Sequence, residues 1–276
     1  MQVLEAAAAR TANPWPLRRE RAAELAERYP HAAEMLRLYQ ALTVIQQRAF
    51  EQAQLDAPPL DDVAYVAATR VLPLVVDATV SAGPVRLRDG VISVFCSTDL
   101  VDLVQRWLDG DALTAFETYL ARASASPLLE GIPHPALPRT RGRGTTPPQS
   151  GMVMYECPAC GGLPQLSYFA VSGEALVSGP RYLVCSRCAN NWVFSRMTCA
   201  SCGEATGTKL PIYQEQERFP HVRVDGCQTC RKYLLTFDIR RETRAVPVVD
   251  EIAALPLDLF ARDQGLTKIT PNLMGS

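Results

Sequence analysis

The sequence lacks the features that would place the protein in a membrane or outside the cell. No apolar run in its 276 residues approaches the roughly 18–20 residues that span a bilayer. The N-terminal segment has no apolar core of the kind found in signal peptides, and Arg18-Arg19 is followed by charged residues rather than apolar ones. The formal net charge of −1 gives the molecule as a whole no field that attracts polyanions. These absences predict a cytoplasmic protein without a membrane span.

The sequence also contains little of what most enzymes use. Its three histidines, His31, His134 and His221, lie in separate regions, and a structural role is favoured for each. No glycine-rich phosphate loop and no G-x-S-x-G sequence is present. We therefore predict no catalytic residue and expect a protein that is not an enzyme.

What the sequence does contain is nine cysteines, eight of them in four Cys-x-x-Cys pairs. The unit C-x2-C-x24-C-x2-C occurs twice, 42 residues apart, and only Cys96 lies outside it, where we expect it to pack as a small apolar residue. In a reducing compartment such pairs are metal sites far more often than disulfides. Four thiolates satisfy one tetrahedral ion, so eight predict two metal sites. The predicted ligands are Cys157, Cys160, Cys185, Cys188, Cys199, Cys202, Cys227 and Cys230.

Two groupings of these cysteines satisfy the count. A contiguous grouping assigns the first four cysteines to one ion and the last four to the other, whereas a cross-braced grouping places the first and third pairs on one ion. The repeat favours the contiguous grouping, because it implies two self-contained units. Either way the sites are closed, with no open position for a water or substrate, which disfavours metal-assisted hydrolysis.

The residue after each pair also carries information. Glycine at this position lets the chain turn with a positive φ, and Gly161 and Gly203 meet that need after the first pair of each repeat. Ala189 and Arg231 stand there after the second pairs. We therefore expect the second turns of the two repeats to close differently from the first.

Residues 1–130 read as a helical domain. Apolar residues from Met35 to Ala49 are spaced by three and four, which predicts a helix that begins after Pro30. The apolar segment 63–80 contains Pro73 and should be kinked or split there. Thr98 is a suitable N-cap for a further helix.

The sequence of the remaining residues, 131–276, predicts a linker, two small modules and a tail. Residues 131–150 are rich in proline and glycine and predict a linker. Short β-rich runs at 165–171, 181–184, 191–196, 210–214 and 233–239 alternate with the cysteine pairs. They predict one small module over 151–198 and a second over 199–245. Residues 246–276 form a tail with a helix from about Pro247 to Asp263, bent near Pro256. The predicted fold class is therefore multidomain α+β.

Paired Cys-x-x-Cys sites are also typical of nucleic-acid-binding zinc ribbons. Residues 151–240 hold nine Lys/Arg and seven Asp/Glu, and each four-thiolate site adds a further negative charge. Phosphate binding requires a clear positive excess, so we predict no nucleic-acid partner. Arg231-Lys232 and Arg240-Arg241 keep nucleic-acid binding as a minor alternative.

Several motifs in the cysteine region and the tail are specific. They are CPACGG at 157–162, GPRYLVCSRC at 179–188, Trp192-x-x-x-Arg196, the last two cysteine pairs, and the tail VDEIAALPLDLFARDQGL followed by TPNL. With these motifs the chain resembles the FdhE family, the formate dehydrogenase accessory proteins. Arg231 replaces a glycine usual in that family, and Leu235 stands where a lysine is common.

The resemblance implies a helical domain joined to two rubredoxin-like modules that bind two iron ions through the eight cysteines. It implies a cytoplasmic protein that binds the catalytic subunit of formate dehydrogenase before export and supports its maturation, in the manner of a chaperone. Zinc is the alternative occupant of four-thiolate sites. Rubredoxin-like electron transfer is the alternative function. The partner-binding surface is not predicted.

Overall fold

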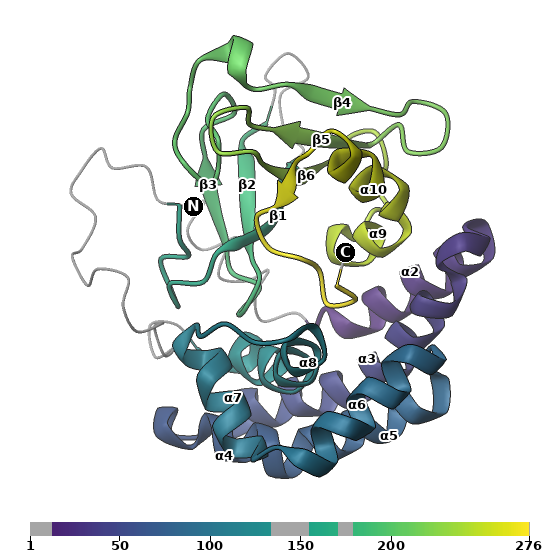
Figure 1. Cartoon of the computed structure of the whole chain (residues 1–276), viewed down its shortest axis with the longest axis vertical. Helices are drawn as coiled ribbons and strands as arrows, with labels where there is room; N and C mark the ends of the chain where they lie inside the picture. Colours follow the sequence, from purple (N-terminus) through teal and green to yellow (C-terminus); the bar gives the residue numbers. More distant parts are fainter. Residues whose placement is uncertain (1–12, 134–154, 171–178, 276) are drawn as a thin grey trace.

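A computed structural model of the chain describes residues 13–133, 155–170 and 179–275, which form a helical half and a β-rich half (Figure 1). The described residues of the N-terminal part are helical, as the predicted fold class requires. Most of the predicted linker, with His134, lies outside the described residues. The helices of this half are α2 (Trp15–Arg28), α3 (Ala33–Leu55), α4 (Val63–Val66), α5 (Leu72–Ala82), α6 (Val85–Ser97), α7 (Leu100–Asp109) and α8 (Ala115–Gly131).

The segment predicted to be kinked or split at Pro73 is irregular there but remains helical. A π-helical segment, Ala67–Val71, joins α4 to α5 directly before this proline. Proline lacks an N–H, and its ring would clash with the carbonyl four residues earlier in a regular helix. The wider π-helical turn tolerates the missing hydrogen bond and avoids the clash with the carbonyl, so the chain remains helical from α4 to α5.

By length and composition, one helical stretch of the described residues, Leu60–Ala82, would be long enough to cross a membrane. This differs from the expectation that no apolar run approaches that length. Half of its most apolar window is buried inside the molecule. Val63, Ala67, Leu72 and Val75 belong to the apolar core of the bundle. The stretch is thus packed as a core helix.

One helix begins a residue later than predicted. Asp99, not Thr98, is the N-cap of α7, because its side chain accepts hydrogen bonds from the backbone N–H groups of Val101 at 2.9 Å and Asp102 at 3.1 Å. A carboxylate also interacts favourably with the helix dipole at this end.

The C-terminal helix is divided in two. It consists of α9 (Pro247–Ala253) and α10 (Leu255–Asp263), separated at Ala254, and Pro256 lies in the first turn of α10. Proline is tolerated there because the first N–H groups of a helix have no partner within it. Gly265 follows α10 with φ at 70°, as expected for a helix end.

The β-rich half is built on one sheet of seven strands. The strands are β1 (Pro164–Phe169), β2 (Arg181–Cys185), β3 (Asn191–Phe194), β4 (Ile212–Gln214), β5 (Val222–Gly226), β6 (Lys232–Asp238) and β7 (Thr267–Lys268). Their order is β3-β2-β1-β6-β5-β4, and β7 pairs with β6. The sequence did not predict β5 and β7.

Each cysteine repeat contributes three antiparallel neighbours to this sheet. The two sets are joined by parallel pairing of β1 and β6, in which Leu166 lies opposite Leu235. The two repeats therefore share continuous backbone hydrogen bonding and one sheet.

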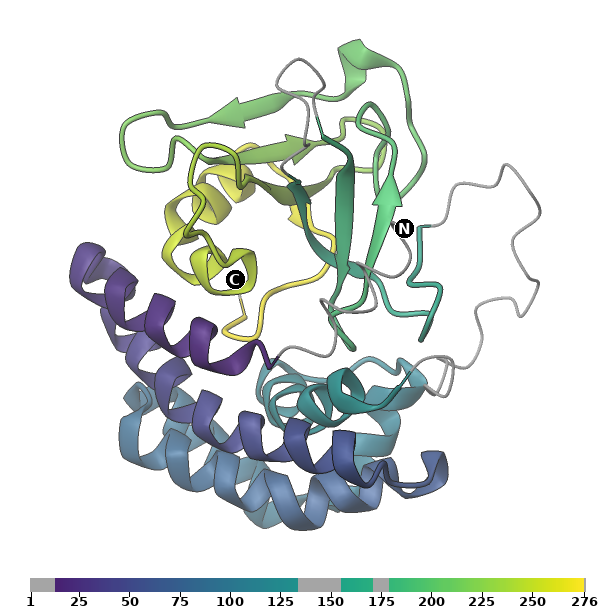
Figure 2. The same ribbon diagram turned by 180° about the vertical axis from the view of Figure 1, so that it is seen from behind.

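The sheet lies between two apolar layers. One face, with Leu166, Val224 and Phe237, packs with α9 and α10 and with residues of α2 and α3. On the other face Leu183 and Trp192 join the apolar core that extends into the helical half. The view from behind shows the helical half below the sheet, with α2 rising beside α9 and α10 (Figure 2).

Candidate metal centres

All four Cys-x-x-Cys turns close with the same hydrogen bond. In each turn the backbone N–H of the first cysteine donates to the carbonyl oxygen of the residue five positions later, at 2.8–2.9 Å. The four bonds run from Cys157 to Gly162, Cys185 to Asn190, Cys199 to Glu204 and Cys227 to Lys232. The local geometry of the turns is thus repeated four times.

The expectation that the second turns close differently is wrong for the backbone conformation of their last residue, although, among these described turns, only the first ones add a bond from the N–H of Gly161 or Gly203 to the carbonyl oxygen of the first cysteine. Gly161 and Gly203 have φ at 73° and 81°, and Ala189 and Arg231 adopt the same left-handed conformation with φ at 52° and 57°. A side chain in this region costs roughly 1–2 kcal/mol. The shared closing bond holds the backbone there despite that cost.

The thiols form two groups of four, and the grouping is the contiguous one. Within each group the sulfurs all lie within 4.8 Å of one another. The Sγ–Sγ distances are 3.7 Å for Cys157–Cys188 and 3.4 Å for Cys160–Cys185. In the second group Cys199–Cys230 and Cys202–Cys227 are both 3.7 Å apart.

These distances suit a metal ion rather than disulfides. A disulfide bond is about 2.05 Å long, and all nine cysteines are free. A tetrahedral ion with metal–sulfur bonds of roughly 2.3 Å places its ligands about 3.8 Å apart. The donor set and its spacing therefore fit a closed four-cysteine site in both groups.

N–H groups point at the sulfurs. The backbone N–H groups of Arg187 and Ser201 donate to the sulfurs of Cys185 and Cys199 at 3.4 Å. The amide of Asn190 donates to the sulfur of Cys157 at the same distance. Such donors stabilise the negative charge of a thiolate.

The first group, Cys157/160/185/188, is enclosed. All four cysteines are buried and belong to the apolar core that continues into the helical half. Arg187 fixes this contact: its guanidinium donates to the carbonyl oxygens of Cys160 at 3.2 Å and Leu108 at 2.9 Å, and lies 5.4 Å from the ring centre of Trp107. Nothing in the local sequence pattern indicated that this arginine joins the two halves.

The second group, Cys199/202/227/230, reaches the surface. Cys202 is exposed and Cys230 is half-buried. Gln228 and Thr229, between the last two ligands, are exposed, and the Thr229 hydroxyl donates to Glu204 at 2.6 Å. Two sites with one sequence pattern thus differ in their access to solvent.

The described residues outside the cysteine pairs have other roles. His221 is buried beside Asp250, with 3.3 Å between its Nε2 and the carboxylate, and the Nε2 of His31 lies 2.9 Å from the carbonyl oxygen of Ala253. Neither histidine lies in a cysteine group. Cys96 is exposed, so the prediction that it packs as an apolar residue is wrong.

A buried ionic network fixes the tail, and the sequence did not reveal it. Lys268 contacts Glu251 at 2.7 Å and Asp258 at 3.0 Å, and the Tyr233 hydroxyl donates to Asp258 at 2.8 Å. These residues come from β7, α9, α10 and β6. Burial without partners would be costly for such charges, so their pairing holds the tail on the sheet.

Fold and sites together define a metal-binding protein in which a helical half encloses one of two four-cysteine clusters. Two family models match the cysteine-containing region: "FdhE, central domain" over residues 156–196 and "FdhE, C-terminal domain" over 197–274. A protein named "Protein FdhE homolog" from Aquifex aeolicus is 33% identical over 119 residues, which are 43% of this chain and 41% of that protein. A homologue of the same name from Shewanella oneidensis is 33% identical over 120 residues, 43% of this chain and 38% of that protein.

These matches span about two fifths of the relatives' length. The fold is also that of a solved structure, the FdhE protein from Pseudomonas aeruginosa, with a TM-score of 0.65. That likeness covers 96% of this chain and 97% of the other at 21% identity. Residues 156–274 are thus similar to the central and C-terminal domains of FdhE proteins, and the fold of the chain is that of an FdhE structure.

Proposed function

We propose that the chain is a cytoplasmic accessory protein for respiratory formate dehydrogenase. It binds the catalytic subunit of that enzyme before export and supports its maturation, and it carries iron in its two four-cysteine sites. The observation that carries the proposal is the pair of closed cysteine groups within the region that matches the FdhE domains.

The geometry supports a role in binding rather than catalysis. Four sulfurs within 4.8 Å of one another saturate one tetrahedral ion and leave no position for a substrate. Many active sites also need a base beside a nucleophile. His31 and His221 do not act as such a base, because each makes a structural contact. The metal then stabilises the β-rich half and shapes its surface.

Gene deletion with complementation tests the proposal. We expect deletion to abolish formate oxidation and the wild-type gene to restore it, while the purified protein binds the isolated catalytic subunit. A variant with Cys157→Ser and Cys160→Ser should fail to complement, and Cys96→Ser, which lies outside both groups, should complement fully. Normal formate oxidation without the gene would overturn the proposal.

The metal is identified by colour and composition. Protein purified in air should be red if four thiolates hold ferric iron, whereas zinc sites are colourless. Metal analysis should find two iron ions per chain. Two zinc ions in protein taken from its native host would refute the iron assignment and leave the accessory function standing.

Electron transfer is a second candidate, and the exposure of Cys202 favours it. Iron in a four-thiolate site changes between two oxidation states, and an exposed ligand gives a redox partner close approach. A redox titration tests it: reversible bleaching at one of the two sites supports electron transfer, and sites that do not respond to oxidant or reductant exclude it.

A further inference from the structure

Three arginines surround one aromatic ring at the end of the sheet distant from the helical half. The guanidinium carbons of Arg196 and Arg223 each lie 4.7 Å from the ring centre of Phe169, and that of Arg240 lies 5.6 Å from it. Arg223 belongs to β5, whereas the other two follow β3 and β6. We call these three residues the arginine cluster.

The ring holds the guanidinium groups near one another without neutralising them. Phe169 is buried, and a cation over an aromatic face is attracted by the ring quadrupole. A guanidinium stacked in this way keeps the N–H groups of its edge free to bind carboxylates, often with two bonds at once. Arg196 and Arg223 are half-buried and Arg240 is exposed.

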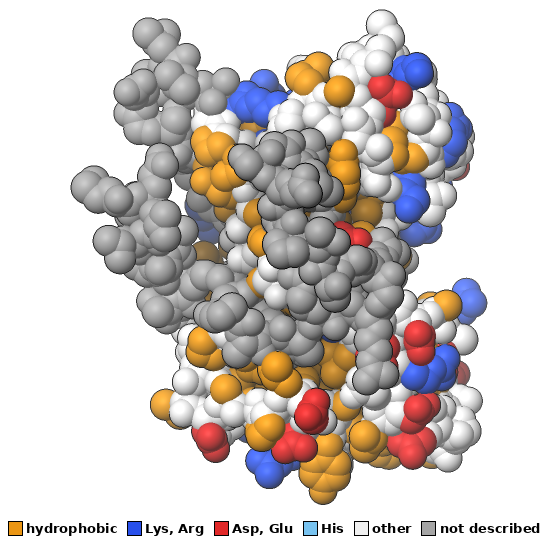
Figure 3. All heavy atoms as spheres, turned by 90° about the vertical axis from the view of Figure 1, so that its left-hand side faces the viewer, with side chains coloured by type: hydrophobic (Ala, Val, Ile, Leu, Met, Phe, Trp, Pro, Cys, Tyr) orange, Lys and Arg blue, Asp and Glu red, His pale blue; other side chains and the backbone are white. Residues whose placement is uncertain are grey.

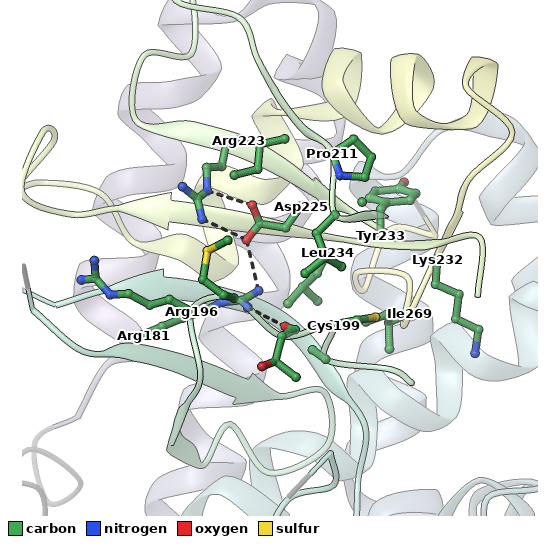
Figure 4. Close-up of a pocket in the computed structure, with 16 residues that line it drawn as sticks. Arg181, Arg196, Cys199, Pro211, Arg223, Asp225, Lys232, Tyr233, Leu234 and Ile269 are labelled. Carbon is green, nitrogen blue, oxygen red and sulfur yellow. Dashed lines mark hydrogen bonds and ion pairs between the residues drawn. The ribbon is translucent and has the colours of Figure 1, made fainter. Parts of the chain in front are cut away.

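Positive charge exceeds negative charge around the cluster. Asp225 is shared by Arg181 at 3.1 Å and Arg223 at 2.8 Å (Figure 4). Asp238 is shared by Arg240 at 2.6 Å and Arg241 at 3.9 Å. Each of these two carboxylates therefore serves two guanidinium groups.

Arg196 is the guanidinium of the cluster left without an ion pair among the residues that the structure describes. Its hydrogen bond goes to the backbone carbonyl of Gly179. Burial lowers the pKa of Arg196, and repulsion from Arg240 and Arg223 lowers it further. The other two guanidinium groups of the cluster therefore repel that of Arg196.

The cluster contrasts with the other half of the molecule. Residues 13–133 hold eleven Lys/Arg and sixteen Asp/Glu, whereas the described residues from 155 onward hold thirteen and eleven. Figure 3 shows acidic side chains mainly on the helical half and cationic ones, beside apolar ones, on the sheet half. The side chains of the sheet half are thus less acidic than those of the helical half, and the arginine cluster is a local feature of the sheet half.

Two apolar side chains adjoin the cluster. Met197 is 59% exposed and Ile212 is 51% exposed, and both line a small cavity together with Arg196 and Arg223. Arginine and methionine are enriched at protein–protein interfaces. Nucleic-acid sites instead need an extended series of cations along a phosphate backbone, which two interspersed carboxylates would oppose.

We propose that the arginine cluster, with Met197 and Ile212, is a docking surface for an acidic segment of a partner protein. Carboxylates of the segment pair with Arg196 and with the N–H groups of Arg240 other than the Nε and Nη2 donors that bind Asp238. An apolar side chain of the segment contacts Met197. This proposal rests on the proposed function, because a protein that binds a client needs a docking surface. Its chemistry is tested without formate dehydrogenase, so the two proposals can fail separately.

The probe is a fluorescent peptide in which Glu and Leu alternate, with a Lys/Leu peptide of equal length for comparison. Fluorescence anisotropy should detect binding of the acidic peptide that weakens as salt rises. The double variant Arg196→Gln/Arg240→Gln should weaken binding about tenfold or more, because charge-assisted hydrogen bonds are lost. The control double variant Arg218→Gln/Arg244→Gln removes the same charge at exposed positions elsewhere on this half and should bind as the wild type does.

Four outcomes of the binding measurements would overturn the proposal. They are absence of binding to the acidic peptide, equal weakening in both double variants, tighter binding of single-stranded DNA than of the peptide, and displacement of the peptide by sulfate beyond the effect of chloride at equal ionic strength. The last outcome would define a small-oxyanion site. Light scattering must find a monomer in the wild type, because self-association lost in the Arg196→Gln/Arg240→Gln variant would assign the cluster to the acidic half of a second copy. Thermal unfolding of both variants confirms that the fold is intact.

Discussion

Arg187 donates a hydrogen bond from its Nη2 to the carbonyl oxygen of Leu108 at 2.9 Å. The last carbonyls of a helix have no partner within it, so this bond satisfies one of them at the end of α7 and places a cation at the negative end of its dipole. One turn of the first metal site thus caps a helix of the other half.

Replacing this arginine should weaken the contact between the two halves. Arg187→Ala removes two buried hydrogen bonds from a charged donor, and we expect the free energy of unfolding to fall by about 2–3 kcal/mol. Urea denaturation measures it through the fluorescence of the three tryptophans, of which Trp107 lies at the contact. Thr229→Ala changes the equivalent position of the second site, which is exposed, and should cost less than about 0.5 kcal/mol. Equal losses would contradict the role of Arg187.

Relief of the left-handed backbone should stabilise the protein. Ala189→Gly removes a steric cost of roughly 1–2 kcal/mol and loses part of it to the greater entropy of unfolded glycine, so we expect a net gain of about 0.5–1 kcal/mol. Gly161→Ala makes the reverse change at the matching position and should destabilise by a similar amount. Thermal unfolding of metal-loaded protein compares the two. A loss of stability in Ala189→Gly would show that φ at this turn relaxes in solution.

The two metal sites should release their ions at different rates. A chelator reaches the exposed ligand Cys202 directly, whereas the first site opens only when the apolar core around it opens. We expect two kinetic phases of equal amplitude, each of one ion, with four thiols becoming reactive toward a thiol reagent in each.

Single ligand variants assign these phases. Cys202→Ser should remove the fast phase and leave the helical half as stable as in the wild type. Cys157→Ser should remove the slow phase and lower the unfolding temperature, because the buried site is part of the core. One phase for both ions would contradict the difference between the sites.

A buried ion pair should make the protein sensitive to acid. Arg21 contacts Asp250 at 2.5 Å, and the backbone N–H of Val246 donates to the same carboxylate. Burial acts to raise the pKa of Asp250, but hydrogen bonds from His221 and Arg21 lower it below its ordinary value. The stabilisation is therefore complete above the unfolded pKa of about 3.9 and is lost as the pH falls through the folded pKa.

Asp250→Asn leaves Arg21 buried without its charge partner and should cost about 3–5 kcal/mol at neutral pH. The difference in unfolding free energy between the variant and the wild type should shrink as the pH falls toward the acid limit. Glu217→Gln, at an exposed position, serves as the control and should change stability by less than about 0.5 kcal/mol. A pH-independent difference would exclude ionisation of Asp250 as the cause.

The sequence predicted local structure, whereas it did not indicate which distant segments pack together. Short-range features were largely correct: the helix through residues 35–49 and the strands that begin near Gln165, Arg181 and Asn191 follow from local spacing. Asp99 displaced Thr98 as the N-cap, because either side chain can cap and only the backbone geometry decides between them. Ala189 and Arg231 show that a closing hydrogen bond can override the preference of a residue for negative φ.

By itself, the sequence determined the four Cys-x-x-Cys turns, because a two-residue spacing fixes each turn locally. Its repeat favoured the contiguous grouping but left the cross-braced one open, and the structure shows the contiguous grouping. Only the tertiary structure decided that the two groups differ in burial. The parallel pairing of β1 with β6 and the contact of Arg187 with Leu108 join segments far apart in the chain, and the Arg21–Asp250 pair spans 229 positions. Burial depends on what packs against a residue. The two repeats have the same cysteine spacing, so the spacing does not indicate which cysteine group the helices will cover.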